Sequence, residues 1–188
     1  GVDIKNNGEI KTNEYEINLV ETEDSFVSNY DKDIPSFEQE EKAYRINGKL
    51  YSNGYSGLIH SVMQLDELKA TSKKYETTIT EYIGACILYS IYTNYIKGKK
   101  TKRNVKLFIP VNARKFFDSN SLRNFVLYVR TNCDFNNKEL VFIDMIKYMK
   151  ETFDNELTKE RLHSRLVSNV SFEKKYVERL LPLFIKRI

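Results

Sequence analysis

Two apolar runs near the middle of the chain have the length and composition of β-strands. Val105–Val111 reads VKLFIPV and Phe125–Val129 reads FVLYV, and both runs are rich in β-branched and aromatic residues. The polar stretch between them, ARKFFDSNSLRN, is too long for a tight hairpin. The pattern predicts two strands joined by an extended connection, with the rest of the chain organised around them.

The clearest helical pattern lies upstream, at Ile79–Ile96. Thr78 and Glu81 have the spacing of a capping box, and Gly98 fits a left-handed stop after the helix. The apolar stripe that we expect to face the core consists of Ile83, Ile87, Ile91 and Tyr95, widened by Leu88 and Tyr92. Most of this helix should therefore be buried, with Cys86 among its apolar neighbours as a small hydrophobic residue.

Weaker patterns complete the outline. They predict strands at Glu14–Val20, Ala43–Asn47 and Tyr55–Leu65, and helices at Leu65–Tyr75, Lys138–Leu157, Lys159–Asn169 and Val177–Ile188. Pro35 and the surrounding acidic residues mark residues 31–41 as a linker. We therefore expect an α/β fold, a two-layer sandwich of a mixed sheet packed with helices. A polar segment with its linker at residues 1–41 would precede a globular part at residues 42–188.

Charge is distributed unevenly along the chain. The net charge of the 188 residues is +4, but residues 21–41 hold eight acidic residues against the single base Lys32. Residues 42–188 carry 27 basic and 14 acidic residues, a surplus of +13. Such a surplus favours an anionic partner, and it is equally typical of a solvated surface. Cys86 and Cys133 have neither the number nor the spacing of a disulfide framework or a metal site.

Basic and amide side chains gather where the two central strands end. Asn112 and Arg114 follow the first run, and Asn124 precedes the second run, which carries Tyr128. Because side chains at strand ends often border a crevice, these four residues are the candidates for a cleft that binds substrate. The alternative is structural: Arg114 would pair with an acid such as Asp118 or Asp134, and Asn124 would satisfy backbone groups.

The same stretch resembles a known family. IPVNAR followed by LRNFVLYVRTN is similar to the paired motifs in the C-terminal half of acyltransferases of the chloramphenicol acetyltransferase superfamily, which includes alcohol acetyltransferases and condensation domains. LDELKATSKKYETTITEYIGACILYSIY upstream and RLLPLFIKRI downstream resemble helices of the same superfamily. The resemblance covers residues 42–188. It implies a CoA-dependent acyltransferase-like lobe that works on acyl-CoA, or a carrier thioester, and a small alcohol or amine acceptor, with no further cofactor.

The catalytic motif of that superfamily is missing from the chain. Its general base is the second histidine of an H-H-x-x-x-D-G motif, which removes a proton from the acceptor. His60 and His163 are the only histidines, and neither is followed by an aspartate at the required position. His60 is the weak candidate for a base, since a lone histidine on an apolar strand is more often a core residue. We expect the lobe that carries the catalytic histidine to be absent, and this chain to be inactive alone.

Other classes of function stay open. A lobe without its base can act as a non-catalytic interaction domain, and a face normally covered by the other lobe should self-associate. A nucleic-acid-binding module would explain the basic loop at residues 97–103, but no recognised motif accompanies that loop. No apolar run reaches membrane-spanning length and the first residues hold no signal-peptide core, so the expected location is cytoplasmic, without a membrane partner.

Overall fold

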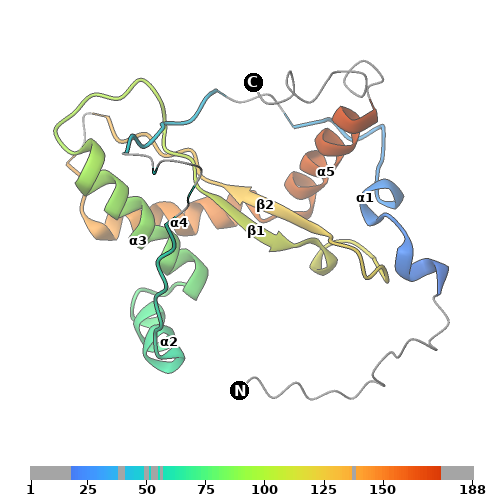
Figure 1. Cartoon of the computed structure of the whole chain (residues 1–188), viewed down its shortest axis with the longest axis horizontal. Coiled ribbons are helices and arrows are strands. Elements are labelled where there is room, and N and C mark those ends of the chain that lie inside the picture. Colours follow the sequence, from blue (N-terminus) through green and yellow to red (C-terminus); the bar gives the residue numbers. More distant parts are fainter. Residues whose placement is uncertain are drawn as a thin grey trace.

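The computed structural model describes residues 18–37, 41–48, 51, 55, 57–136 and 139–174, with backbone alone for the last two. In chain order, the elements are the 3₁₀ helix η1 (Leu19–Thr22), α1 (Ser25–Ser28), α2 (Leu65–Lys74), α3 (Ile79–Ile91), the π-helical turn η3 (Tyr92–Ile96), β1 (Phe108–Asn112), the 3₁₀ helix η4 (Ala113–Lys115), β2 (Val126–Arg130), α4 (Phe142–Glu156) and α5 (Lys159–Lys174). The fold is mixed α/β, and its helices are arranged around a small sheet (Figure 1).

The two central apolar runs form the predicted strand pair. β1 and β2 are antiparallel, with Ile109 opposite Val129 and Val111 opposite Leu127. β1 begins later than its apolar run because the amide of Leu107 donates to Oγ1 of Thr131, at 2.8 Å, in place of a ladder bond. The expected mixed sheet is not what the described residues form, since their sheet has only these two antiparallel strands.

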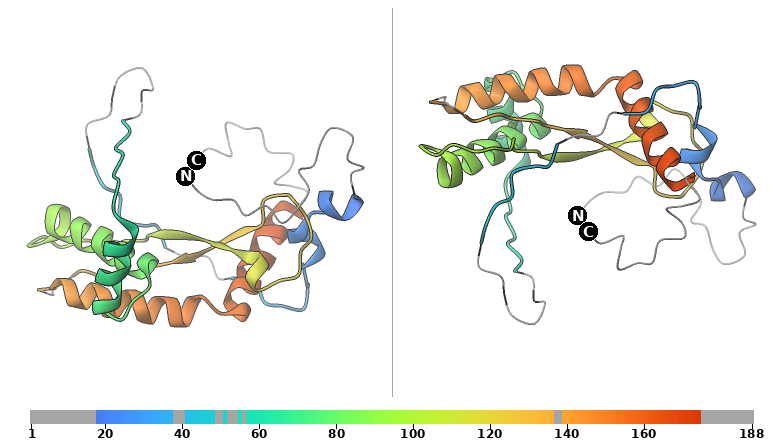
Figure 2. Two further views of the ribbon diagram at one scale, coloured as in Figure 1. Left: turned by 90° about the horizontal axis from the view of Figure 1, so that it is seen from below. Right: turned by 90° about the horizontal axis from the view of Figure 1, so that it is seen from above.

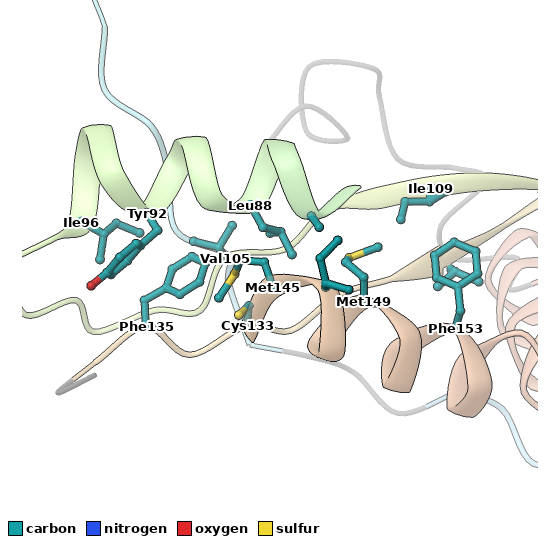
Figure 3. Close-up of a cluster of buried hydrophobic side chains, with 13 residues drawn as sticks. Leu88, Tyr92, Ile96, Val105, Ile109, Cys133, Phe135, Met145, Met149 and Phe153 are labelled. Carbon is teal, nitrogen blue, oxygen red and sulfur yellow. The ribbon is translucent and has the colours of Figure 1, made fainter. Parts of the chain in front are cut away.

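The main core lies between α3, α4 and one face of the sheet (Figure 3). Its buried members are Ala85, Leu88, Tyr92, Ile96, Val105, Ile109, Val129, Cys133, Phe135, Met145, Ile146, Met149 and Phe153. Gly84 lets α3 approach α4 closely, because a Cβ atom there would lie 2.5 Å from Cε of Met149. Glycine at position 84 lowers the helix propensity of α3 but allows α3 and α4 to pack closely.

The predicted helix at residues 79–96 is confirmed, but it turns a different face to the core. Thr78 and Glu81 form the capping box, and Gly98 has a φ of 76°. The buried side chains are those of Ala85, Leu88, Tyr92 and Ile96, whereas Ile87 and Tyr95 are each 40% exposed. Cys86 is also exposed, so its predicted place in the core was wrong. Because this helix is apolar on several faces, its periodicity alone does not select the buried face.

The helices after the sheet follow the predicted order with shifted bounds. α4 starts at Phe142, four residues after the predicted start, where Oδ2 of Asp144 accepts the amide of Val141 at 2.9 Å. α5 continues five residues beyond its predicted end at Asn169. The helix predicted at Val177–Ile188 lies outside the described residues. None of the helices in the described part of the chain is both long and apolar enough to cross a membrane.

The predicted strands of the first third are largely wrong where the structure describes them. Leu19 and Val20 lie in η1 instead of a strand, and residues 14–17 are outside the described part. Residues 41–48 contain no strand, although the amide of Tyr44 donates to the carbonyl of Asn104 at 2.8 Å. Residues 57–64 also form no strand, and Ile59 and Val62 are almost fully exposed. Alternation predicts which side chains share a face, but a strand also needs a neighbouring strand.

Residues 18–37, which we call the strap, run along α5 and the connection between the strands (Figure 2). Phe26 and Tyr30 of the strap pack against a second core, and Phe26 meets Phe125 edge to face at 5.0 Å. The buried members of this core are Ala113, Phe117, Phe125, Leu127, Leu162, Leu166 and Val170. The strap thus has extensive contacts with later residues, and the division of the chain at residue 41 stays a prediction.

Candidate functional site

A cleft of about 580 Å³ lies where the start of α3, the end of β1 and the end of α4 meet. It is lined by Thr78, Thr80, Glu81, Pro110, Val111, Asn112, Lys115, Phe116, Phe153, Asp154 and Leu157. This volume lies in the usual range for small-molecule sites. Apolar side chains and several polar groups line the cleft together, which is the usual composition of a ligand site.

The first turn of α3 borders the cleft with its polar groups already engaged. Oγ1 of Thr78 accepts the amide of Glu81 at 3.3 Å, and Oε2 of Glu81 accepts the amide of Thr78 at 2.6 Å. The capping box satisfies two helix-end donors that would otherwise seek another acceptor. This rim of the cleft is therefore fixed in position before any ligand binds.

Asn112 and Arg114 lie together at the end of β1. Oδ1 of Asn112 accepts the backbone amide of Arg114 at 3.1 Å and caps the short helix η4. The Arg114 side chain turns to the connection, where its Nη2 donates to the carbonyl of Ser121 at 2.7 Å and to that of Arg123 at 2.5 Å. Asn112 is among the residues that line the cleft, and its role in binding substrate stays a prediction. Arg114 holds loop backbone and pairs with neither Asp118 nor Asp134 in the described structure.

Asn124 and Tyr128 are not among the residues that line the cleft. Asn124 is exposed, immediately before the buried Phe125. Tyr128 is paired with Pro110 across the sheet and packs against Phe108, at 5.3 Å between ring centroids. The structure thus brings Asn112 and Arg114 together at the end of β1, and of the four candidates only Asn112 is among the residues that line the cleft.

Neither histidine borders the cleft. His60 lies exposed in the extended residues 57–64, so its predicted place on a strand was wrong. His163 lies on α5, where its Nε2 is 3.0 Å from the carbonyl oxygen of Asn29 and its ring meets Phe117 edge to face. His163 thus holds the strap to α5, and neither imidazole is among the groups that line the cleft.

Cys86 is exposed as a residue, but its thiol is partly shielded from water by its neighbours. Burial raises the pKa of its thiol, and a hydrogen bond with Tyr82, one helical turn away, opposes that effect only in part. A raised pKa leaves less of the reactive thiolate near neutral pH. Among the described residues, no three histidine, cysteine or acidic side chains are grouped closely enough to hold a metal ion.

Several residues of the cleft carried no signal in the sequence. Thr80, Lys115 and Asp154 come from three elements, and neither spacing nor composition indicates that these elements meet at one cleft. Thr78 and Glu81 were predictable as a cap but not as part of a site. Asn112 was predictable because it follows an apolar strand directly.

Comparison with known proteins supplies the family. The model of a family described as alcohol acetyltransferase matches residues 10–178, which is most of the chain. No curated protein and no solved structure matches the chain.

Proposed function

Because the chain belongs to the alcohol acetyltransferase family, we propose that it forms the C-terminal lobe of an enzyme that transfers an acyl group to an alcohol or amine. The donor would be acyl-CoA or a carrier thioester, and the proposed architecture is the two-layer sandwich of CoA-dependent and condensation-type acyltransferases. The observation that carries the proposal is the preformed cleft beside Asn112, which combines an apolar wall with a polar rim.

The lining of the cleft suits an uncharged reactant. Glu81 and Asp154 are acidic and Lys115 is the one basic residue, so the formal charge of the lining is negative. Such a lining disfavours a phosphate and accepts a hydroxyl or a thioester chain, for which Asn112 and Thr80 supply neutral polar groups. The cleft would therefore hold the acceptor or the thioester end of the donor, with the CoA phosphates outside it.

The base for the reaction would come from elsewhere. Attack of an alcohol on a thioester requires a base within hydrogen-bond distance, and the absence of one typically costs a factor of about 10²–10⁴ in rate. His60 and His163 lie away from the cleft, so we assign the base to the H-H-x-x-x-D-G histidine of another lobe. The chain alone would bind substrate without turning it over.

A thiol-release assay with acetyl-CoA and a panel of short alcohols tests the proposal. The purified chain should show no turnover above background, and calorimetry should detect weak, saturable binding of acetyl-CoA. Lys115→Gln and Asn112→Ala should weaken that binding by about 10-fold, because each removes a polar group from the cleft. Lys147→Gln, which removes the same charge from an exposed position on α4, is the matched control and should bind as the unmodified chain does.

Two results would contradict this assignment. Turnover that disappears in His60→Ala or His163→Ala would make that histidine the base and would show that the chain needs no second lobe. Equal loss of binding in Lys115→Gln and Lys147→Gln would mean that the affinity for acetyl-CoA depends on the overall charge of the protein and not on the cleft.

Exposed apolar side chains on the sheet and on the connection between its strands favour a second role as an interaction surface. Phe108 and Val126 of the sheet are exposed, and so is Leu122 of the connection. Contact of such side chains with water is unfavourable, and a partner lobe or a second copy of the chain would cover them. Static light scattering should detect association that grows with concentration and falls in Leu122→Ser; a monomer at every concentration would refute this role.

A further inference from the structure

Residues 57–64, which we call the arm, are an extended segment with apolar side chains in water. In both views of Figure 2 the arm, drawn in teal before α2, points away from the helices. Ile59 is 95% and Val62 is 96% exposed, and Leu58 and Met63 are 78% and 58% exposed. A single apolar side chain on a surface is ordinary, but four on one short segment mark a contact surface.

The backbone of the arm has no partner either. Among the described residues, no hydrogen bond reaches a main-chain or side-chain group of residues 58–63. The sheet of the described part of the chain consists of β1 and β2 alone, so the arm has no neighbouring strand. An extended segment with unpaired amides and carbonyls is a template for pairing with another strand. A lipid bilayer is a poorer partner, because it would leave these backbone groups without hydrogen bonds.

The polarity of the side chains along the arm is the same in both directions. From residue 58 to residue 63 the sequence reads LIHSVM, which is two apolar residues, two polar ones and two apolar ones. Two antiparallel copies centred between His60 and Ser61 therefore place every apolar residue opposite another. A shift by one or two residues places an apolar side chain opposite His60 or Ser61, so the pattern selects one register. In that register the opposed pairs are Leu58 with Met63, Ile59 with Val62, and His60 with Ser61.

Antiparallel pairing of two arms also gives a closed assembly. A twofold axis relates the two strands, so both copies use the same surface and the complex ends at two chains. Side chains of opposed residues lie on the same face of a strand pair. Each face therefore carries Leu58 and Val62 of one copy beside Ile59 and Met63 of the other. These side chains then contact one another across the strands instead of water.

We propose that the arm is a dimerisation strand, which pairs antiparallel with the arm of a second copy of this chain. Backbone hydrogen bonds would join residues 58–63 of the two copies, with His60 of each copy opposite Ser61 of the other. The contact does not depend on acyl transfer, since no residue of the arm lines the cleft at the end of β1. It is also distinct from the exposed apolar surface of the sheet and of the connection between its strands.

Sedimentation velocity over a wide range of protein concentration tests the arm. A Leu122→Ser background removes an apolar side chain of the other surface. We expect a monomer–dimer equilibrium, weakened by about 10-fold or more in Val62→Lys, because the twofold axis places this change in two pairs. Leu19→Lys also replaces a highly exposed apolar side chain, that of Leu19 in η1, and should leave association unchanged. Since all these side chains are exposed in the single chain, circular dichroism should show a native fold in each variant.

Two charge variants test the register of the strands. Ile59→Asp and Val62→Lys should each associate weakly alone, because each places a charge opposite an apolar residue in both pairs. Mixed in equal amounts they should associate more tightly, because the carboxylate of one copy then faces the ammonium group of the other. A mixture that associates no better than its separate components would overturn the antiparallel register.

Cysteine cross-linking gives an independent test of the same register. His60→Cys and Ser61→Cys, each in a Cys86→Ser background that removes the exposed native thiol, should form a disulfide when mixed and little in either variant alone. Opposed Cα atoms of antiparallel strands are about 4.5–5.5 Å apart, a separation that a disulfide can span. Cross-links within each single variant as strong as in the mixture would overturn the proposal. It also fails if the chain is a monomer at every concentration, or if Val62→Lys and Leu19→Lys weaken association equally.

Discussion

Two neighbouring substitutions in α3 test which face of this helix is buried. Leu88 is fully buried between α3 and α4, whereas Ile87 is 40% exposed. Replacing either residue by alanine removes three carbon atoms from the same stretch of helix. The two variants therefore differ in burial while the number of carbon atoms removed is the same.

The structure gives different costs for the two positions. Leu88→Ala should lower the free energy of unfolding by about 3 kcal/mol, within the range of about 2–5 kcal/mol for buried leucines. We expect a cost in the lower half of this range because two flexible methionines of the same core, Met145 and Met149, can partly fill the cavity. Ile87→Ala should cost only about 1 kcal/mol, since part of its side chain is already in water and alanine favours the helix.

Urea denaturation followed by far-ultraviolet circular dichroism measures both costs. At a slope of about 2 kcal/mol per molar urea, the midpoint should fall by about 1.5 M in Leu88→Ala and about 0.5 M in Ile87→Ala. Equal losses, or a larger loss for Ile87→Ala, would mean that α3 is rotated and that residues 83, 87, 91 and 95 face the core after all.

Three further predictions concern the same helix. Thr78→Ala should cost about 1 kcal/mol in the same denaturation assay because the capping box loses an acceptor, whereas Thr80→Ala should change little. Gly84→Ala should destabilise the protein by about 1–2 kcal/mol despite the better helix propensity of alanine, and a double-mutant cycle with Met149→Ala should remove that cost. Iodoacetamide should modify Cys86 more slowly at pH 8 than a free thiol, with a rate that rises at higher pH, since burial raises its pKa; peptide mass spectrometry that finds the free-thiol rate would contradict this.

The sequence was most informative where local chemistry decides the structure. The capping box at Thr78, the stop at Gly98 and the strand pair on either side of the connection are confirmed, because each depends on a few adjacent residues. The place of Asn112 at the end of β1 was predictable for a similar reason, because it directly follows the apolar run in the sequence.

Features that depend on distant partners were not predictable. The buried face of α3 is chosen by α4, and the apolar alternation at Tyr55–Leu65 lacks a neighbouring strand in the described residues. Arg165 is an ordinary member of α5 in the sequence, and its burial depends on residues far away in the chain, among them Phe37, more than a hundred residues earlier. Burial of a charge is a tertiary property, and no local pattern indicates it.

The bonds between Ser121 and the strap constrain the order of folding. Oγ of Ser121 donates to the carbonyl of Glu23 at 2.6 Å and lies 3.2 Å from that of Glu21, across 98 and 100 residues of chain. Arg114 in turn donates to the carbonyl of Ser121, and its amide is bonded to Asn112, so the end of β1 beside the cleft depends on the same long-range contacts. Contacts of high sequence separation form late, because the intervening loop must close first. On the ribosome, residues 18–37 therefore leave the exit tunnel long before their binding surface exists, and the cleft acquires its final rim only after synthesis has passed the second strand.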